Sequence, residues 1–299
     1  MFDEAQITSG PALTQSPEFA RALQALGQSP LWLPGGPDML VLRRRVAGLR
    51  VAMIPRYEAD QTAALPDRLH AAATGATPVL LSPDRPTSAL ARIGALPVMT
   101  PATVARLDLT PNHDTLRARM HQKWRNRLRH GERQPWRITR ERLPPDPGHW
   151  LLTAEAAQAR ALGYRNWPTA LTLAYAHANP TATKLFTAWR GKDAVAGMVF
   201  LTHGHSATYH IGLSTPEGKS GSAHNLLLWH AMMWLQRQGI SSLDLGLLDT
   251  QHAAGLARFK LGCGATPWRM GGTWLWWRPA RWMFRTLARL DRKRMVWAR

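Results

Sequence analysis

The sequence predicts an α/β (α+β) fold in two domains. The chain has 299 residues, 45% of them hydrophobic, which is long for one domain and enough for two buried cores. Runs with the alternating pattern of strands are interspersed with runs at helical spacing. The proline-rich segment Leu143–Gly148 cannot continue a helix or a central strand. We therefore place the domain boundary there, between residues 1–143 and residues 149–299.

The first domain begins as a small α/β unit. Its expected elements are a hairpin over 39–54, a helix over 62–73, a strand over 78–81 and a strand over 103–109. Thr110 and Pro111 then supply an N-cap and a first-turn proline, which predicts a helix from there to about His130, stopped by Gly131. Apolar residues at every fourth position line one side of that helix, and arginines and a lysine occupy the other sides.

The second domain repeats the mixture of helices and strands. Its expected elements are helices over 150–162 and 168–178, a hairpin of strands 184–189 and 194–201, a strand over 207–213, a long apolar helix ending at Gly239 and a strand over 241–247. The last of these strands contains a single acid, Asp244, and is followed by the cluster Arg258-Phe259-Lys260.

The chain is strongly basic, with a formal net charge of +19. Residues 112–142 contain ten basic and three acidic residues, and residues 278–299 contain eight basic and one acidic residue. Such segments attract polyanions, including RNA and acidic membrane surfaces, although a basic surface also arises from arginine-rich codon usage. The concentration of charge in two segments favours a polyanionic partner.

The remaining composition narrows the class of protein. One cysteine, Cys263, excludes an internal disulfide and a cysteine-rich metal site. The acidic, polar N-terminus has no signal-peptide pattern, and no segment looks able to span a bilayer, so a cytoplasmic protein is expected. His203 and His205 have the spacing of metal ligands but lack an acidic or cysteine partner, so no metal is expected. Motifs of serine hydrolases, P-loop ATPases and zinc proteases are absent from the sequence.

The segment 239–265 resembles the last part of the peptidoglycan-bridge aminoacyltransferases, the Fem family, and of their relatives in the GNAT acyltransferase superfamily. The residues that carry the resemblance are Asp244 and Gly246 on the strand and the pair Phe259-Lys260 after it. The run 121–127 (HQKWRNR) is similar to a Fem helix, although Asn126 directly follows Arg125, so the match is approximate. The long helical arm of some Fem enzymes has no counterpart. The resemblance implies two tandem GNAT-like domains, each a mixed twisted sheet flanked by helices, with the first on the acceptor side.

The same resemblance suggests residues for amide formation. Lys260, beside Phe259, would stabilise the oxyanion of the tetrahedral intermediate in a dry cleft. Asp108, at the end of its strand, would orient the attacking amine or accept its proton. Independently of the resemblance, Tyr209 lies on a strand expected to face the cleft and is a candidate general acid, with core packing as the alternative. Asp244 is expected to hydrogen-bond neighbouring backbone. A surface helix with one buried Phe and a solvated Lys is the alternative for Phe259 and Lys260.

A donor site is expected where the loop 217–223 meets a helix, because backbone N–H groups and the helix dipole attract phosphate there. GNAT enzymes bind the coenzyme A pyrophosphate at this point through a basic or amide residue and two small residues. Here Gly221 and Ala223 match, but Gly218 stands where the basic or amide residue belongs. A plain flexible turn explains the glycines equally well. The candidate donor- or phosphate-binding residues are Lys219, Gly221, Ala223, His224, Asn225 and Arg258.

Two basic segments are candidates for contact with nucleic acid. The first lies on the helix after Pro111, and the second would be an amphipathic helix after Pro279 with interleaved tryptophans. The second suits RNA, an acidic membrane surface or docking on the protein body. The candidate nucleic-acid-binding residues are Lys123, Arg125, Arg127, Arg129, Arg281, Arg285, Arg289 and Arg292.

The leading hypothesis is an enzyme that moves an aminoacyl group from charged tRNA to a primary amine of a cell-wall precursor, a peptide or a small metabolite. It needs no cofactor beyond aminoacyl-tRNA as co-substrate, and it would be cytoplasmic or peripheral at the inner membrane face. Two alternatives stay open. One is an acyl-CoA-dependent GNAT N-acyltransferase, and the other is a non-catalytic module that binds RNA or membrane.

Overall fold

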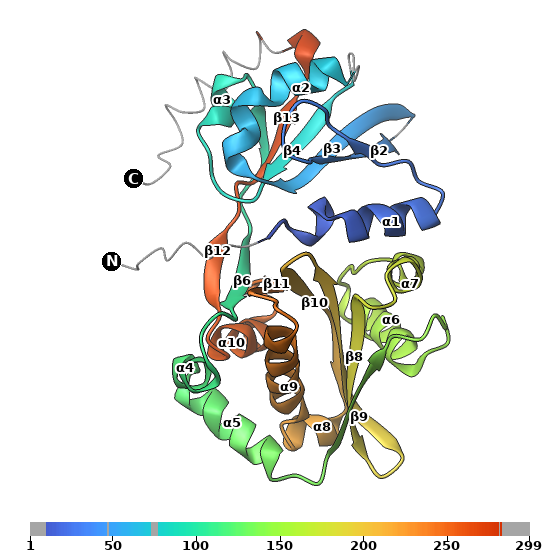
Figure 1. Ribbon diagram of the computed structural model, residues 1–299, viewed down its shortest axis with the longest axis vertical. Helices are drawn as coiled ribbons and strands as arrows, with labels where there is room; N and C mark the ends of the chain where they lie inside the picture. Colours follow the sequence, from blue (N-terminus) through green and yellow to red (C-terminus); the bar gives the residue numbers. More distant parts are fainter. Residues whose placement is uncertain (1–9, 47, 73–76, 281, 283–299) are drawn as a thin grey trace. The chain divides into compact units, whose positions relative to one another are not determined.

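The computed structural model describes residues 10–46, 48–72, 77–280 and 282 of the chain. Contacts between these residues divide them into two compact units, which are described separately (Figure 1). Unit 1 comprises residues 10–13, 17–26 and 104–268. Unit 2 comprises residues 14–16, 27–103 and those from 269 onward, within the described ranges.

Unit 1 is built on a mixed seven-stranded sheet in the order β12-β6-β11-β10-β9-β8-β7. The strands are β6 (Thr103–Asp108), β7 (Arg137–Arg142), β8 (Thr183–Arg190), β9 (Asp193–His203), β10 (Ser206–Ser214), β11 (Ser242–Leu247) and β12 (Thr266–Arg269). Strands β10 and β11 pair in parallel, whereas β7 to β10 form an antiparallel meander and β11 pairs antiparallel with β6. The parallel pair is connected by a helix, as such a crossover requires.

Helices cover both faces of this sheet (Figure 1). They are α1 (Pro17–Ala25), α4 (His113–Arg119), α5 (Gln122–Glu132), α6 (Trp150–Leu162), α7 (Thr169–Ala178), α8 (Pro216–Ser220), α9 (Ala223–Arg237) and α10 (Ala254–Gly262). Helix α9 is apolar nearly all round because it lies between the sheet and helix α5. Helices α6 and α7 pack on the opposite face, around Tyr175 and Leu151.

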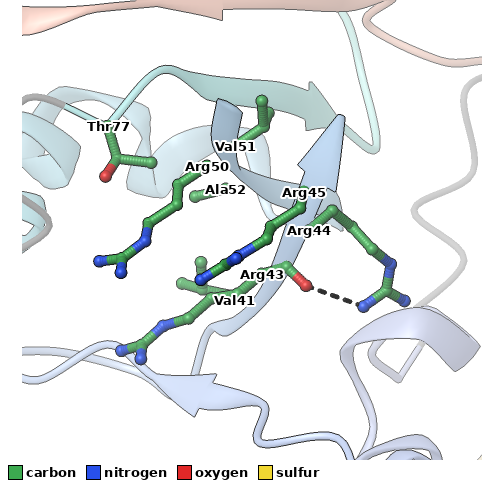
Figure 2. A pocket seen from close by; sticks show the side chains of 8 residues that line it. All are labelled: Val41, Arg43, Arg44, Arg45, Arg50, Val51, Ala52 and Thr77. Carbon is green, nitrogen blue, oxygen red and sulfur yellow. Dashed lines mark hydrogen bonds between the residues drawn. The ribbon is translucent and has the colours of Figure 1, made fainter. Parts of the chain in front are cut away.

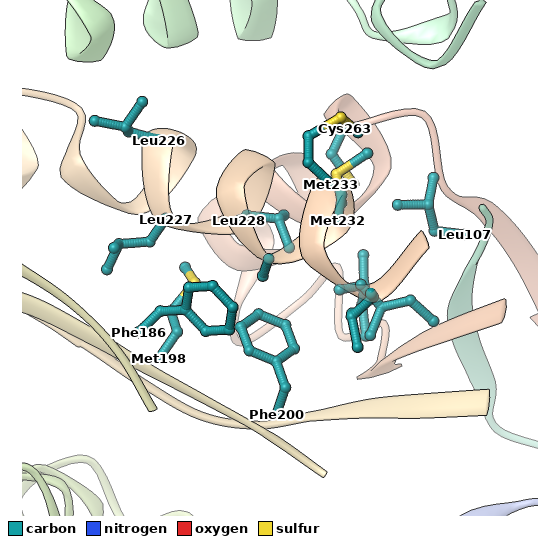
Figure 3. Close-up of a cluster of buried hydrophobic side chains, with 14 of the residues drawn as sticks. Leu107, Phe186, Met198, Phe200, Leu226, Leu227, Leu228, Met232, Met233 and Cys263 are labelled. Carbon is teal, nitrogen blue, oxygen red and sulfur yellow. The ribbon is translucent and has the colours of Figure 1, made fainter. Parts of the chain in front are cut away.

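The core between α9 and the sheet is the larger hydrophobic cluster of unit 1 (Figure 3). Leu227, Leu228 and Met232 of α9 are fully buried over Phe186 and Phe200 of the sheet. Phe186 and Phe200 meet edge to face, with ring centroids 5.6 Å apart. This packing fixes the position of α9, and therefore of the residues at its N-terminus, relative to β10.

Unit 2 is built on a six-stranded sheet in the order β1-β2-β3-β4-β13-β5. Its elements are β1 (Leu31–Trp32), β2 (Leu40–Val46), β3 (Leu49–Tyr57), η2 (Ala59–Ala64), α2 (Leu65–Ala71), β4 (Val79–Pro83), α3 (Ala89–Arg92), β5 (Leu96–Met99), β13 (Thr273–Trp276) and η3 (Arg278–Ala280). A short 3-10 helix, η1 (Leu13–Gln15), precedes α1. Leu65 and Leu69 of α2 pack on Ile54, Val79 and Leu81 of the sheet.

The two units repeat one arrangement. In unit 1 the hairpin β9–β10 leads through α9 to β11, which is parallel to β10. In unit 2 the hairpin β2–β3 leads through α2 to β4, which is parallel to β3. In each unit an antiparallel strand from elsewhere in the chain then pairs with the second strand of the parallel pair, β6 with β11 and β13 with β4. The predicted fold class, two tandem GNAT-like α/β domains with mixed sheets, is confirmed.

The predicted single helix from Thr110 to about His130 is wrong in detail. The chain forms α4 and α5, which are separated at Met120 and His121, both in extended conformation. The His121 ring caps α5, with Nδ1 accepting from the Lys123 N–H at 3.2 Å, and the His121 N–H donates to the carbonyl of Gly262. The N-cap of α4 is Asn112 rather than Thr110.

The packing also divides the chain elsewhere than at the proline-rich segment 143–148. The chain passes between the two units at residues 13–14, 16–17, 26–27, 103–104 and 268–269. The reason is that the segment before the prolines belongs to the unit 1 sheet, with β6 paired to β11 and β7 paired to β8. Residues 269–280 return to unit 2, where β13 inserts between β4 and β5.

This return places part of the tryptophan-rich C-terminal segment in the unit 2 sheet. Trp274 and Trp276 belong to β13, and Trp276 is buried in the unit 2 core. Pro279 lies in the short helix η3. The predicted amphipathic helix with Arg281, Arg285, Arg289 and Arg292 falls outside the described residues.

Candidate active site

Strands β10 and β11 part from each other within the unit 1 sheet. They pair at Ser206–Thr208 with Ser242–Asp244, and in the described chain this pairing ends there although both strands continue. Each strand has an irregularity at that level, β10 between Tyr209 and Ile211 and β11 between Asp244 and Leu247. Bulges increase local twist and bend a strand, so these two turn the strands apart. Beyond this level the two strands are therefore not paired with each other within the described chain.

The irregularity in β11 is built by the sequence Asp244-Leu245-Gly246. Gly246 has a φ of +80°, in the left-handed region that favours glycine. The Asp244 carboxylate accepts a hydrogen bond from the Gly246 N–H at 2.7 Å, which confirms the backbone role predicted for it. Together the two residues turn the end of β11 towards α10.

Lys260, on α10, is buried against this turn. Its Nζ donates a hydrogen bond to the Leu247 carbonyl at 2.8 Å. A Cβ on Gly246 would lie 3.6 Å from the Lys260 Nζ, so the ammonium group sits directly beside the turn. Burial lowers the pKa of Lys260 to about 8, and the nearby Asp244 carboxylate opposes that decrease. A partly desolvated cation at this place can stabilise developing negative charge on a substrate.

Phe259 is the aromatic neighbour of this lysine. Its ring centroid lies 6.0 Å from that of Trp124 and 6.1 Å from that of His224. The Trp124 indole N–H donates to the Phe259 carbonyl at 3.1 Å, which ties α10 to α5. Phe259 is half-buried and packs against the core, so α10 is not a free surface helix.

His224 performs for β10 what Lys260 performs for β11. Its Nε2 lies 2.8 Å from the Leu213 carbonyl oxygen, which can only accept, so Nε2 carries the proton. Burial lowers the pKa of His224 to about 4, which keeps the ring neutral near pH 7. The ends of the two separated strands are thus each held by a side chain, one from α9 and one from α10. His224 thus helps to hold the scaffold, and its role in donor binding stays a prediction.

The Tyr209 side chain lies on the face of β10 that packs against the core formed with α9. Its ring centroid is 5.7 Å from that of Phe200, and a Cβ on Gly212 would lie 1.8 Å from its hydroxyl oxygen. The phenol therefore covers Gly212, where only glycine fits. Burial raises the pKa of Tyr209, so the hydroxyl keeps its proton, and within the described residues it makes no hydrogen bond.

Asp108 does not lie near Lys260, contrary to the prediction that the two flank the reacting groups. Asp108 pairs with Ser242 at the first residue of β11, whereas Lys260 contacts Leu247 at the last. A strand rises about 3.3 Å per residue, so the level of Asp108 and the level of Lys260 along β11 lie roughly 15 Å apart. The Asp108 carboxylate instead accepts from the Thr110 N–H and hydroxyl and pairs with Arg119. It shapes the turn before α4.

The expected phosphate loop is filled by other parts of unit 1. Residues 216–220 form the short helix α8 rather than a loop. A Cβ on Gly218 would lie 2.3 Å from the Val195 carbonyl, so no basic or amide side chain fits there. The Trp136 indole lies on Gly221, where an added Cβ would be 2.2 Å from the ring, and its N–H donates to the Gly221 carbonyl at 3.3 Å.

The other candidate donor residues differ in how far they are buried. Ala223 is fully buried in the core and Asn225 is buried on α9, whereas Lys219 and Arg258 are exposed. Ser222, the N-cap of α9, has a φ of 59° and a buried hydroxyl without a partner within the described chain. These residues do not form the basic, glycine-lined cradle that the loop pattern predicts.

The basic helix α5 presents an exposed cationic side. Lys123, Arg127 and Arg129 are exposed, in agreement with a binding surface. Arg125 is different, because its guanidinium donates to the carbonyls of Ala118 and Met120, both at 2.8 Å. It satisfies the C-terminus of α4.

His203, one of the two histidines with the spacing of metal ligands, makes ordinary hydrogen bonds. One ring nitrogen lies 3.1 Å from the Pro11 carbonyl and the other lies 3.0 Å from the Thr208 hydroxyl. His203 is buried whereas His205 is exposed.

Within the described part of the chain, no helix is long and apolar enough to cross a membrane.

The acetyltransferase (GNAT) domain matches residues 118–270, more than half of the chain, and the chain belongs to this family. It is an acyltransferase of the GNAT superfamily with a Fem-like fold. A search of curated proteins found no match.

Three solved structures illustrate the likeness of fold. The crystal structure of FemX matches with a TM-score of 0.74 at 14% identity, over 93% of this chain and 96% of that one. The C-terminal domain of a putative lysylphosphatidylglycerol synthetase from Agrobacterium fabrum has a TM-score of 0.59 at 13% identity, over 94% and 93%. L-PGS from Bacillus licheniformis has a TM-score of 0.54 at 14% identity, over 94% and 97%.

Proposed function

We propose that the protein transfers an aminoacyl group from charged tRNA to a primary amine, with aminoacyl-tRNA as co-substrate and without a further cofactor. The observation that carries the choice of donor is the packing at the N-terminus of α9. Trp136 covers Gly221, and Gly218 has no room for a side chain, so the features with which a GNAT loop holds the coenzyme A pyrophosphate are lost. A donor that binds mainly through a long polyanion does not depend on that loop.

Two further observations support a tRNA donor. Among structural neighbours, FemX has a name shared with the aminoacyltransferase family that segment 239–265 resembles, and another is named for synthesis of an aminoacylated lipid. The charge of +19 and the exposed basic residues Lys123, Arg127 and Arg129 of α5 suit an RNA backbone. The acceptor would be the amine of a cell-wall precursor, a peptide or a small metabolite.

The proposed reaction forms one C–N bond and breaks one C–O bond. The neutral amine attacks the ester carbonyl, and the Lys260 ammonium stabilises the resulting oxyanion. The nitrogen loses one proton to solvent as the amide forms. The ribose oxygen leaves with a proton donated by the Tyr209 hydroxyl, which then recovers one from solvent. Phe259, whose ring packs against those of Trp124 and His224, is proposed to limit the access of water near α10.

The direct test is to incubate the purified protein with mixed tRNAs charged with labelled amino acids and a panel of primary amines. Formation of labelled amide, lost in the Lys260→Met variant, is expected. The matched control is Lys192→Met, which removes an exposed lysine from the β8–β9 turn and should keep full activity. Absence of amide with every charged tRNA, from a protein that is folded, would refute the proposal.

The description of the matching family as an acetyltransferase domain favours one alternative, an acyl-CoA donor. Titration calorimetry with coenzyme A distinguishes the two donors. Micromolar binding of coenzyme A without a mobility shift of tRNA at moderate salt would establish the alternative. A non-catalytic RNA- or membrane-binding module is the third possibility, and turnover that depends on Lys260 excludes it. A cytoplasmic location with contact at an acidic membrane face belongs to the same proposal.

A further inference from the structure

The hairpin β2–β3 of unit 2 carries four arginines close together. Arg43 is paired with Ala52, Arg44 with Val51 and Arg45 with Arg50. Because side chains alternate along a strand, Arg43 and Arg45 share a face with Arg50, and Arg44 lies on the other face. Figure 2 shows the guanidinium groups of Arg43, Arg45 and Arg50 extending to one side and that of Arg44 to the opposite side.

These three arginines border a pocket of about 440 Å³. Its apolar floor includes Val41 and Ala52, which are buried, and Thr77 supplies a hydroxyl group at its edge (Figure 2). The hairpin extends past the start of β4, since Ala52 of β3 is the partner of Val79. Arg43, Arg45 and Arg50 therefore lie on the same face of the sheet as the core residues Val41 and Ala52, towards the turn of the hairpin. A volume of this size lies in the range of small-molecule sites.

The charges of this cluster are not balanced within the described residues. Arg43, Arg45 and Arg50 make no side-chain hydrogen bond or ion pair there, and no acidic residue lines the pocket. Arg44, by contrast, donates to the Gln28 side chain at 2.8 Å. Arg45 and Arg50 are directly opposite each other on antiparallel strands, an arrangement that repels and disfavours the hairpin. An anion between them would remove that cost.

We propose that this arginine pocket binds a phosphorylated small molecule through its phosphate groups. Guanidinium groups bind phosphate in a bidentate manner, and three of them around one concavity match an anion with two or more negative charges. The apolar floor would hold the uncharged part of the same molecule. A pocket of this kind favours a compact ligand over an RNA backbone, which tracks extended grooves or surfaces. The site belongs to unit 2 alone and is independent of the reaction proposed for unit 1.

The test uses the full-length protein with pyrophosphate and inorganic phosphate as probes, by titration calorimetry at low ionic strength. Pyrophosphate should bind more tightly than phosphate. Arg45→Gln and Arg50→Gln should each weaken pyrophosphate binding by roughly tenfold, the effect of losing one charge-assisted hydrogen-bonding group. The charge-matched control is Arg92→Gln, an exposed arginine of α3 outside the pocket, which should bind pyrophosphate as the wild type does.

Thermal unfolding without added anion gives a second readout. Because Arg45 and Arg50 repel each other, Arg45→Gln should unfold at the same temperature as the wild type or higher, and a given concentration of pyrophosphate should stabilise the wild type more than the variant. Equal pyrophosphate binding by the wild type and Arg45→Gln would overturn the proposal. So would destabilisation of the anion-free variant, which indicates a purely structural arginine. The proposal would likewise be overturned if the wild type bound no pyrophosphate and Arg45→Gln instead lost binding to tRNA or to anionic phospholipid vesicles.

Discussion

Replacing Lys260 by methionine should make the protein more stable while it removes activity. Burial lowers the pKa of Lys260 from 10.5 to about 8, so at pH 7 the folded state holds the ammonium at a cost of about 3 kcal/mol relative to the unfolded chain. Methionine removes that cost and also the hydrogen bond to the Leu247 carbonyl, which contributes about 1 kcal/mol. The variant should therefore gain about 2 kcal/mol at pH 7.

The sign of the pH dependence follows from the same pKa. Below pH 8 both the folded and the unfolded states carry the charged lysine, and the full cost is present. As the pH rises from 8 towards 10.5, the folded protein loses this proton before the unfolded chain does, so the wild type gains stability. At pH 9.5 the advantage of the variant should fall to about zero. Tyrosines and Cys263 titrate in both proteins and cancel in the difference.

The assay is urea denaturation of the wild type and Lys260→Met at several pH values between 7 and 9.5, with aminoacyl transfer measured on the same samples. We expect kcat to fall by about 10²-fold or more, as for loss of one oxyanion-stabilising group. A variant that is less stable than the wild type at pH 7 would refute the reasoning. A stability difference that does not change with pH would show that the lysine is not held as a costly buried cation.

Three further predictions test the neighbouring features. Asp244→Asn removes the charge that raises the pKa of Lys260, so the loss of activity at alkaline pH should begin below that of the wild type, near 8, in a pH–kcat profile. Gly218→Arg restores the residue type of the GNAT loop but meets the Val195 carbonyl, so it should destabilise the protein by about 3 kcal/mol in urea and gain no coenzyme A affinity in calorimetry. The triple change of Lys123, Arg127 and Arg129 to Gln should lower the salt slope of tRNA binding by about 3, whereas Arg160→Gln on α6 should leave it near the wild-type value.

Most elements of the fold could be predicted because each has a characteristic pattern within its own residues. Helix α6 occupies the predicted residues 150–162, and the hairpins β2–β3 and β8–β9 lie where alternation and turn residues placed them. The break between α4 and α5 was missed because it depends on a contact with Gly262, far along the chain. The insertion of β13 into the unit 2 sheet was missed for the same reason, since a four-residue strand carries little pattern of its own.

The candidate site divides in a similar way. The pair Phe259-Lys260 and the Asp244-Leu245-Gly246 turn could be found from the sequence, because each is contiguous. Asp108 was misplaced because a strand end can meet either end of its partner, and only the register with Ser242 decides which. Trp136 was overlooked, because nothing in its local sequence indicates a contact with Gly221, a residue 85 positions away.

The sequence alone determined the basic character and the mixture of helices and strands, since these follow from composition and short-range periodicity, whereas the tandem GNAT-like fold and the groups for acyl transfer were expected from the resemblance to the Fem family. Tertiary structure decided which of those groups share an environment. Packing buries Lys260 beside the Gly246 turn and lowers its pKa. It also buries His224, which keeps the ring neutral. Finally, it places the Trp136 indole on Gly221. The physical reason is that burial, pKa and steric access depend on neighbours brought together by packing, which no single segment of the chain encodes.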